Sequence, residues 1–172
     1  MNEQIKQKFC REFGTEQVLF EEPMKKHTTF RIGGPAEIFV MPKTTEEVAK
    51  ALEICRQEEI PYFVLGNGSN LLVSDQGYRG VIIQMDRNME EVTVEGTEIR
   101  AAAGALLSSI AAAARRSSLA GFEFAGGIPG TLGGAVVMNA GAYGGEMKDV
   151  LKDVTVMTQD GEVRVIPAGE LE

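Results

Sequence analysis

The chain of 172 residues has no tryptophan, a single histidine and only two cysteines, Cys10 and Cys55. Two thiols are too few for a disulfide framework, and the absence of a Cys-x-x-Cys motif removes the usual cysteine-based metal site. The apolar run Ala101–Ala114 is too short to span a bilayer and is broken by glycine and serine. The first ten residues contain no apolar signal-peptide core. We therefore expect a cytoplasmic protein with no metal and no membrane partner.

Positive charge is also scarce, because 17 lysines and arginines face 25 acidic residues and give a net charge of -8. A nucleic acid would be repelled by this excess of negative charge, so we expect no nucleic-acid partner. The same charge repels anionic cofactors at long range. A phosphate site in this chain would therefore depend on local backbone N–H groups.

Glycine is the residue that the chain has in excess, and nine glycines fall within Gly121–Gly145. Glycine loses the most backbone freedom on folding, so a segment of this composition is expensive to order. A ligand that lies directly on the backbone would compensate for this cost, since a Cβ would obstruct it. The alternative is a set of tight turns between short strands.

A second glycine loop, Gly66–Asn70, follows the short apolar segment Tyr62–Leu65. A strand that ends in Gly-Asn-Gly-Ser-Asn forms a concave group of N–H donors that suits a phosphate or pyrophosphate. Two established phosphate motifs are absent. No Gly-Lys-Ser/Thr tripeptide occurs, and Leu71 stands where the dinucleotide fingerprint requires a third glycine. A simple turn is the alternative interpretation of this loop.

The first half of the chain has a strand–helix–strand pattern. Ile5, Phe9 and Phe13 recur at helical spacing within residues 1–20, and Thr44–Glu47 is a capping box that opens a second helix. Strands are predicted at Glu37–Met41, Tyr62–Leu65 and Val81–Met85. The pattern predicts an N-terminal helical segment over residues 1–20 and a small α/β lobe over residues 21–86.

The second half, residues 87–172, is predicted to form another lobe. It opens with a hairpin over Glu91–Arg100 that turns at Glu95-Gly96, followed by a helix over Leu106–Arg116. Ala135–Met138 is predicted to be a buried strand. A final hairpin pairs Val154–Met157 with Val163–Ile166 around Asp160-Gly161.

Three motifs occur in a fixed order: HTTFRIGGPA from His27, LGNGSNLLVSD from Leu65 and GIPGTLGGAVVMNAGAYG from Gly127. From about residue 20 to its end, the chain resembles the UDP-N-acetylenolpyruvoylglucosamine reductases. The resemblance implies an α/β (α+β) fold, the two-lobed FAD-binding fold of the vanillyl-alcohol-oxidase or PCMH type, in which both lobes clasp the cofactor. A separate C-terminal substrate domain normally follows.

The resemblance also implies the site residues. Tyr143 is expected to hold a substrate phosphate, and the cofactor-binding residues are expected to be Leu65, Gly66, Asn67, Gly68, Ser69, Asn70, Gly127, Ile128, Pro129, Gly130, Thr131, Gly133, Gly134, Ala135, Asn139, Ala140 and Gly141. FAD is expected to bind noncovalently, because His27 is poorly placed to bond it. We predict a hydrogen-bonded turn for His27 and a carboxylate partner for Arg31. A valine at Gly68 is predicted to block FAD and to leave the fold largely intact.

In this family NADPH gives a hydride to the flavin, and the reduced flavin converts UDP-N-acetylglucosamine enolpyruvate to UDP-N-acetylmuramate for the bacterial cell wall. The arginine, serine and glutamate that assist this reaction have no counterpart in residues 1–172, so we expect no catalytic residue in the chain. We expect a monomeric FAD-binding fragment that is inactive by itself. The alternatives are part of another flavin oxidoreductase of the same fold and a non-catalytic nucleotide-binding module.

Overall fold

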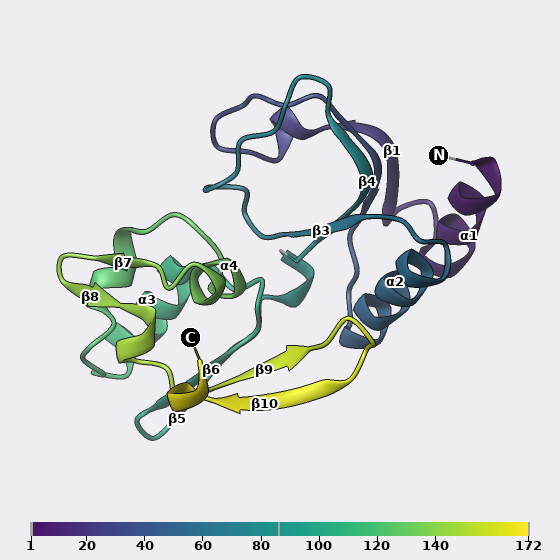
Figure 1. The fold of residues 1–172 in the computed structure, drawn as a ribbon. Coiled ribbons are helices and arrows are strands. Elements are labelled where there is room, and N and C mark those ends of the chain that lie inside the picture. Colours follow the sequence, from purple (N-terminus) through teal and green to yellow (C-terminus); the bar gives the residue numbers. More distant parts are fainter. Residues whose placement is uncertain (1, 86, 172) are drawn as a thin grey trace. The chain divides into compact units, whose positions relative to one another are not determined.

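The structure is a computed structural model that describes residues 2–85 and 87–171 (Figure 1). The chain divides into two compact units, Met1–Asn88 and Met89–Glu172, and each unit is described by itself. Asp86, the last residue of the predicted first lobe, lies outside the described residues. None of the helices within the described ranges is long and apolar enough to cross a membrane.

The first unit is built on a four-stranded sheet with the order β1-β2-β4-β3. Its strands are β1 (Val18–Pro23), β2 (Pro35–Val40), β3 (Tyr62–Leu65) and β4 (Tyr78–Gln84). Strand β1 is antiparallel to β2, whereas β2, β4 and β3 are parallel. The predicted order of strand, helix and strand is confirmed, although β4 begins earlier than the predicted Val81 and ends before Met85.

The central strands of this sheet are buried on both faces. Side chains alternate along a strand, so neighbouring buried residues such as Phe39 and Val40 point to opposite faces. On β4 the run Val81–Ile83 is buried throughout. Such continuous apolar runs are typical of parallel strands that are covered on both sides. One side carries the cluster of Met24, Ala36, Phe39, Leu65 and Ile82.

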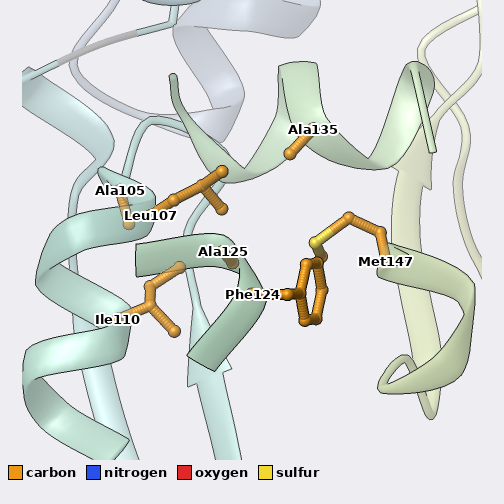
Figure 2. Packing of buried hydrophobic residues seen from close by; sticks show 7 residues of the cluster. All are labelled: Ala105, Leu107, Ile110, Phe124, Ala125, Ala135 and Met147. Atoms are coloured by element: carbon orange, nitrogen blue, oxygen red, sulfur yellow. The ribbon is translucent and has the colours of Figure 1, made fainter. Parts of the chain in front are cut away.

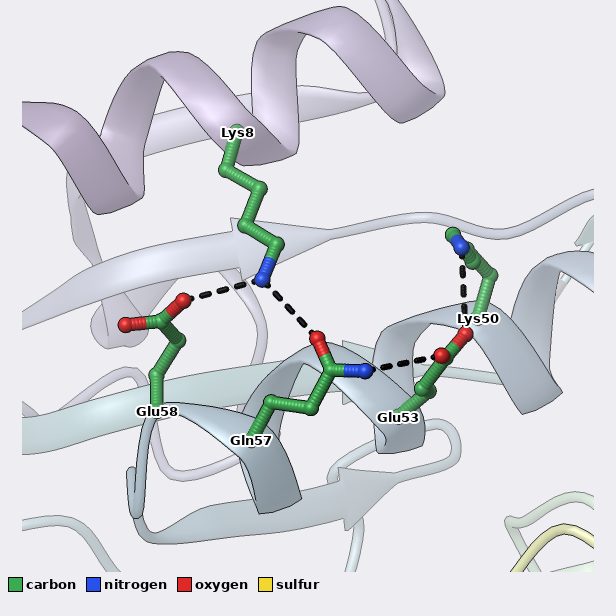
Figure 3. Close-up of polar contacts among 5 residues, drawn as sticks. All are labelled: Lys8, Lys50, Glu53, Gln57 and Glu58. Atoms are coloured by element: carbon green, nitrogen blue, oxygen red, sulfur yellow. Dashed lines mark hydrogen bonds and ion pairs between the residues drawn. The ribbon is translucent and has the colours of Figure 1, made fainter.

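Helices α1 (Glu3–Phe13) and α2 (Thr45–Gln57) lie side by side in this unit (Figure 1). The predicted capping box of α2 is half formed. The Thr44 hydroxyl accepts a hydrogen bond from the Glu47 N–H at 3.2 Å, but the Glu47 carboxylate accepts from the Lys43 N–H at 2.7 Å. Lys8 ties the two helices together by donating to Gln57 at 3.0 Å and to Glu58 at 2.9 Å, beside the Lys50–Glu53 pair (Figure 3).

The second unit packs short helices around a small apolar core. Its helices are α3 (Leu107–Arg116) and α4 (Leu132–Val137), and 3-10 turns lie at Glu123–Gly127 and Met147–Asp149. The core consists of Ala105, Leu107, Ile110, Phe124, Ala125, Ala135 and Met147. Figure 2 shows these seven side chains, with Phe124 and Met147 among the larger members of the core.

Three two-stranded hairpins complete the second unit. They are β5 (Val92–Glu95) with β6 (Glu98–Ala101), β7 (Gly141–Ala142) with β8 (Gly145–Glu146), and β9 (Asp153–Met157) with β10 (Val163–Pro167). Both predicted hairpins are confirmed. The first one turns at Gly96-Thr97, one residue later than predicted, because Glu95 pairs with Glu98.

The predicted strand Ala135–Met138 is wrong, because most of this segment lies in helix α4 and Met138 caps the helix. A short apolar run fits a buried strand and a helix equally well, so its periodicity could not decide between them. Gly133 and Gly134 lower the intrinsic helix propensity of the segment, but the packing of Ala135 on the core outweighs this unfavourable effect. Val137 and Met138 are exposed, which a buried strand would not allow.

Candidate functional site

The first glycine loop, Gly66–Asn70, begins where β3 ends. Leu65 is buried in the core and fixes the start of the loop. Because β3 and β4 are parallel, the connection that starts with this loop returns the chain to the opposite end of the sheet. The loop therefore lies at the carboxyl edge of the parallel strands, where open α/β sheets bind their ligands.

Several N–H groups of this loop are free to bind a ligand. Within the described part of the chain, the N–H groups of Asn67, Gly68 and Asn70 donate to no backbone carbonyl. Consecutive free N–H groups at a left-handed residue form an anion-binding concavity, and Gly68 has φ of +66°. The arrangement agrees with the pyrophosphate-binding role predicted for the loop.

Gly68 also has a structural role that the sequence did not reveal. A Cβ at this position would lie 1.9 Å from the His27 carbonyl oxygen. The Thr29 N–H donates to the Gly68 carbonyl at 3.2 Å and braces the loop from the same side. The prediction that valine at Gly68 would leave the fold largely intact is therefore wrong, because the side chain would collide with backbone.

His27 forms the predicted hydrogen-bonded turn, since its N–H donates to the Met24 carbonyl at 2.8 Å. Its ring packs on Phe39 with centroids 4.2 Å apart, and its Nε2 lies 3.0 Å from Glu22 Oε1. Partial burial raises the pKa of the Glu22 carboxyl. Hydrogen bonds from His27 and Lys26, together with their charges, outweigh that effect and lower the pKa below its usual value.

The carboxylate partner predicted for Arg31 is absent, because Arg31 makes no ion pair with any residue of the described ranges. The carboxylate of Glu22 is already engaged by His27 and Lys26. Arg31 is exposed and has φ of +55°, a left-handed conformation that is uncommon for a residue with a Cβ.

The second glycine loop runs through Gly127–Gly134 in the second unit. The N–H groups of Leu132 and Gly133 donate to the carbonyls of Ala105 and Ala103, both at 2.8 Å. Those of Gly130, Thr131 and Gly134 donate to no carbonyl among the described residues. The loop is thus anchored at two positions and keeps three N–H groups available for a ligand.

Two glycines of this loop have no structural explanation within their own unit. At Gly127 a Cβ would meet no atom within 4 Å, and φ is not positive. At Gly134 the nearest atom would be Thr131 Oγ1 at 3.7 Å, an ordinary contact. Glycine inside a helix costs about 1 kcal/mol relative to alanine. The space left by the two missing Cβ atoms is what a ligand needs to approach the backbone. Gly133 differs, because its Cβ would lie 3.0 Å from the Ala103 Cβ.

Thr131 carries a hydroxyl that lacks a partner. Its side chain is 1 % exposed, and Oγ1 forms no hydrogen bond with the described residues. A buried unpaired hydroxyl costs about 1–3 kcal/mol. Its neighbours Ile128 and Ala135 have a different use, because their side chains pack on the apolar core.

The segment after α4 holds the remaining predicted site residues. The Asn139 amide donates to Glu146 Oε2 at 2.7 Å and accepts from the Lys148 N–H at 3.0 Å, so its side chain is committed to the protein. The Ala140 N–H donates to the Ala135 carbonyl at 2.8 Å, and the Ala140 carbonyl accepts from the Met147 N–H at 3.0 Å. The Asn139 N–H is engaged as well, since it donates to the Val136 carbonyl at 3.1 Å, so neither residue offers a free N–H group to a ligand.

Tyr143 stands at the tip of the β7–β8 hairpin. Its φ of +54° and that of Gly144, +87°, are both positive, as a two-residue type I′ turn requires. Its side chain is 99 % exposed in the described structure. The hairpin turn accounts for this backbone conformation, but the exposed side chain contributes no packing to the fold.

A groove in the first unit was not predicted from the sequence. It has a volume of about 650 Å³, and polar side chains from separate segments line it: Lys26, Thr29, Arg31, Asn67, Gln84 and Asn88. The lining residues come from the segment Lys26–Arg31 and from positions far from it in the sequence, so no single motif indicated the groove. Only Asn67 belongs to the predicted site.

The family model described as an FAD binding domain matches residues 36–166. The UDP-N-acetylenolpyruvoylglucosamine reductase of Alkaliphilus metalliredigens is 53 % identical over 170 residues, which cover 99 % of this chain and 56 % of the relative. The reductase of Clostridioides difficile is 48 % identical over 157 residues, which cover 91 % of this chain and 52 % of that relative. The chain spans about half the length of the curated relatives that it matches.

Two solved structures are informative. The UDP-N-acetylenolpyruvylglucosamine reductase of Thermus caldophilus is 38 % identical with a TM-score of 0.74, over 90 % of this chain and 53 % of its own. p-Cresol methylhydroxylase is 20 % identical with a TM-score of 0.71, and the match covers 94 % of this chain and 34 % of the other. At this low identity the likeness shows the fold alone. Together these likenesses confirm the predicted fold class.

Proposed function

The chain belongs to the FAD-binding domain family, and from that premise we propose that it forms the FAD-binding portion of a UDP-N-acetylenolpyruvoylglucosamine reductase. Its curated relatives of that name are about half identical and align with nearly the whole chain. The observation that carries the proposal is the set of unengaged N–H groups in both glycine loops, together with the unfilled space at Gly127 and Gly134.

The residues of the two loops suit a dinucleotide diphosphate. Neutral N–H donors can hold phosphate oxygens without a cation, which matters in a chain of net charge -8. We assign diphosphate contacts to the N–H groups of Gly66–Asn70. Contacts along the diphosphate and the flavin are assigned to Gly127–Ala135 and Asn139–Gly141. When bound, FAD supplies hydride-transfer chemistry.

The chain's own residues orient the cofactor rather than react with it. Pro129 fixes φ directly before Gly130, so this part of the loop is stiff before the ligand arrives. The anchoring bonds of Leu132 and Gly133 hold the free N–H groups of their neighbours in place. The His27 ring is occupied by Glu22 and Phe39, which supports noncovalent binding of the flavin.

The remaining parts of the reaction follow from the family. We propose NADPH as the hydride donor and UDP-N-acetylglucosamine enolpyruvate as the substrate, with the phenol of Tyr143 bound to a substrate phosphate. The product, UDP-N-acetylmuramate, would serve peptidoglycan synthesis and hence cell shape and division, in the cytoplasm. We assign no catalytic residue to the chain. We propose a monomer without membrane or nucleic-acid partners.

The direct test is uptake of FAD by the purified 172-residue chain. The chain should retain or take up one FAD per molecule, with the visible absorption of a flavin, and should release it completely when denatured. A folded chain that takes up no added FAD would overturn the proposal. Colour that remains on the denatured chain would overturn the noncovalent assignment alone.

A further inference from the structure

The β7–β8 hairpin is too short to keep its shape by itself. Its strands, Gly141–Ala142 and Gly145–Glu146, have two residues each. Even a longer hairpin of two strands is only marginally stable in water. The turn between the strands carries Tyr143, whose exposed side chain contributes no packing to the fold. Contacts with the rest of the second unit must therefore hold this hairpin in place.

Glu146, the last residue of β8, is at the centre of these contacts. Its Oε2 accepts a hydrogen bond from the Asn139 amide at 2.7 Å and lies 2.8 Å from the Lys148 Nζ. The Asn139 amide oxygen in turn accepts from the Lys148 N–H at 3.0 Å. Hydrogen bonds from Lys148 and Asn139 lower the pKa of the Glu146 carboxyl, so it is an ionised acceptor at neutral pH. These bonds tie the segment before β7 to the segment after β8.

The backbone of the hairpin also packs closely. At Gly145 a Cβ would lie 2.9 Å from the Phe124 ring, and at Gly141 a Cβ would lie 2.8 Å from the Gly145 carbonyl oxygen. The Met147 N–H donates to the Ala140 carbonyl at 3.0 Å. The hairpin is thus pressed onto the core by its backbone and closed at its base by side-chain hydrogen bonds.

The contacts of Glu146 matter more for the position of the hairpin than for the stability of the unit. The side chains of Glu146 and Lys148 are 43 % and 65 % exposed, and exposed ion pairs contribute little to stability. What the contacts fix is the place of the Tyr143 phenol, whose hydroxyl can donate to a phosphate oxygen. A donor that is held in place before the ligand arrives loses less freedom on binding.

We propose that Glu146 is a positioning residue that holds the β7–β8 hairpin so that the Tyr143 phenol meets a phosphate of the substrate. The inference rests on the proposed function in one respect, the substrate contact of Tyr143. Glu146 acts through the hairpin, because its own negative charge repels a phosphate. Removal of a nearby negative charge should by itself strengthen the binding of an anion. Loss of the position should weaken it, so the two effects have opposite signs.

The test titrates the full 172-residue chain with UDP-N-acetylglucosamine, which carries a diphosphate, and follows the Tyr143 amide signal by NMR. E146A should weaken binding about tenfold, as should Y143F. The double variant E146A/Y143F should bind no more weakly than Y143F. E146Q should recover most of the affinity, because its amide oxygen can still accept from Asn139. E162A is the matched control, since Glu162 pairs with Arg164 beside the other hairpin and its loss should leave binding unchanged.

A second measurement needs no ligand. Nitrogen-15 relaxation should show that the Tyr143 amide moves more on the nanosecond timescale in E146A than in the parent chain, while the signals of the apolar core keep their positions. An unchanged Tyr143 amide would overturn the inference. This measurement also identifies a variant that has failed to fold, because the core signals would then shift as well.

The outcomes separate this inference from the proposed function. E146A that binds the sugar nucleotide as tightly as the parent or more tightly overturns the inference, as does E146A/Y143F that binds about tenfold more weakly than Y143F. A parent chain that does not bind the probe, or Y143F that binds like the parent, overturns the inference together with the substrate contact of Tyr143. Uptake of FAD by the parent chain decides the proposed function separately.

Discussion

The main chain of Gly68 packs so closely against the carbonyl of His27 that a Cβ on Gly68 would lie 1.9 Å from that oxygen. The Thr29 N–H reinforces the same approach by donating to the Gly68 carbonyl. The turn at His27 therefore supports the glycine loop, although the two belong to separate sequence motifs. The contact indicates that the motif beginning at His27 has a structural role in supporting the Gly66–Asn70 loop.

The substitution G68A should destabilise the first unit by about 2–4 kcal/mol, because it combines a positive φ with a backbone collision. Urea unfolding of the flavin-free chain measures this change. The matched control is G96A, where φ is +61° but no atom lies within 4 Å of the added Cβ. It should lose only about 1–2 kcal/mol. Equal losses for the two variants would mean that the contact with His27 contributes nothing.

The substitution G127L should leave the unfolding free energy within about 1 kcal/mol of the parent, because the side chain enters open space. Its FAD affinity should fall at least tenfold, since that space is assigned to the ligand. Equilibrium titration with FAD provides the measurement. G169L is the control, because Gly169 also has no neighbour within 4 Å and lies outside both loops. If G127L and G169L bind FAD equally well, Gly127 does not contact the cofactor.

The substitution T131V replaces the unpartnered hydroxyl with a methyl group of similar shape. In the absence of ligand, the chain should be as stable as the parent or more stable by about 1 kcal/mol, because a buried unpaired group is removed. FAD binding should weaken about tenfold if Oγ1 donates to the cofactor. Thermal unfolding with and without FAD measures both effects. A loss of stability without ligand would show that the hydroxyl supports the fold.

The two cysteines should differ in their reactivity toward thiol reagents. Burial raises the pKa of the Cys55 thiol to about 12. At pH 8 only about one Cys55 in ten thousand is then a thiolate, the form that reacts. Cys10 is partly exposed on α1 and should be alkylated first. Mass spectrometry of the chain after brief treatment with iodoacetamide measures the order, and faster modification of Cys55 would contradict its burial.

The first unit should become less stable in acid, because protonation of Glu22 removes the stabilisation that its carboxylate provides. Its pKa is lower in the folded chain than the usual value of 4.5, so the folded state favours the ionised carboxylate. The stabilisation is complete above about pH 4.5 and is lost as the pH falls through the lowered folded-state pKa. E22Q should lower the free energy of unfolding by about 1 kcal/mol or less at neutral pH, and the stability of the variant should depend less on pH in the acid range. The midpoints of urea unfolding, measured across the acid range, test this prediction. E16Q is the control, because Glu16 is exposed and its loss should leave the acid dependence of stability unchanged.

Local signals predicted most of the elements. The Thr44 hydroxyl caps α2 as its sequence pattern indicates, and Asp160-Gly161 closes the β9–β10 hairpin. Both depend on neighbouring residues alone. Helix α4 could not be predicted in this way, because its apolar run suits either structure and the contact of Ala135 with the core decides the outcome.

The candidate site was predictable only where glycines mark it. Gly127 and Gly134 proved to be unexplained by packing, as a ligand-binding loop requires, whereas Gly68 proved to be needed by the fold. The groove was invisible in the sequence because its lining comes from the segment Lys26–Arg31, from Met41, from Asn67 and from Gln84 and Asn88, which only the fold brings together. The prediction of an ion pair for Arg31 was wrong, because the sequence does not reveal which carboxylates are already engaged by other residues.

The order of strands in the first unit has a consequence for protein synthesis. Strand β4 is the last strand of this sheet to leave the ribosome, yet it occupies the place between β2 and β3. Until it inserts, the far end of the segment that begins with Gly66–Asn70 is not fixed, and its N–H groups have no defined arrangement. A nascent chain therefore acquires the arrangement of this loop, which we propose binds the diphosphate, in one late step.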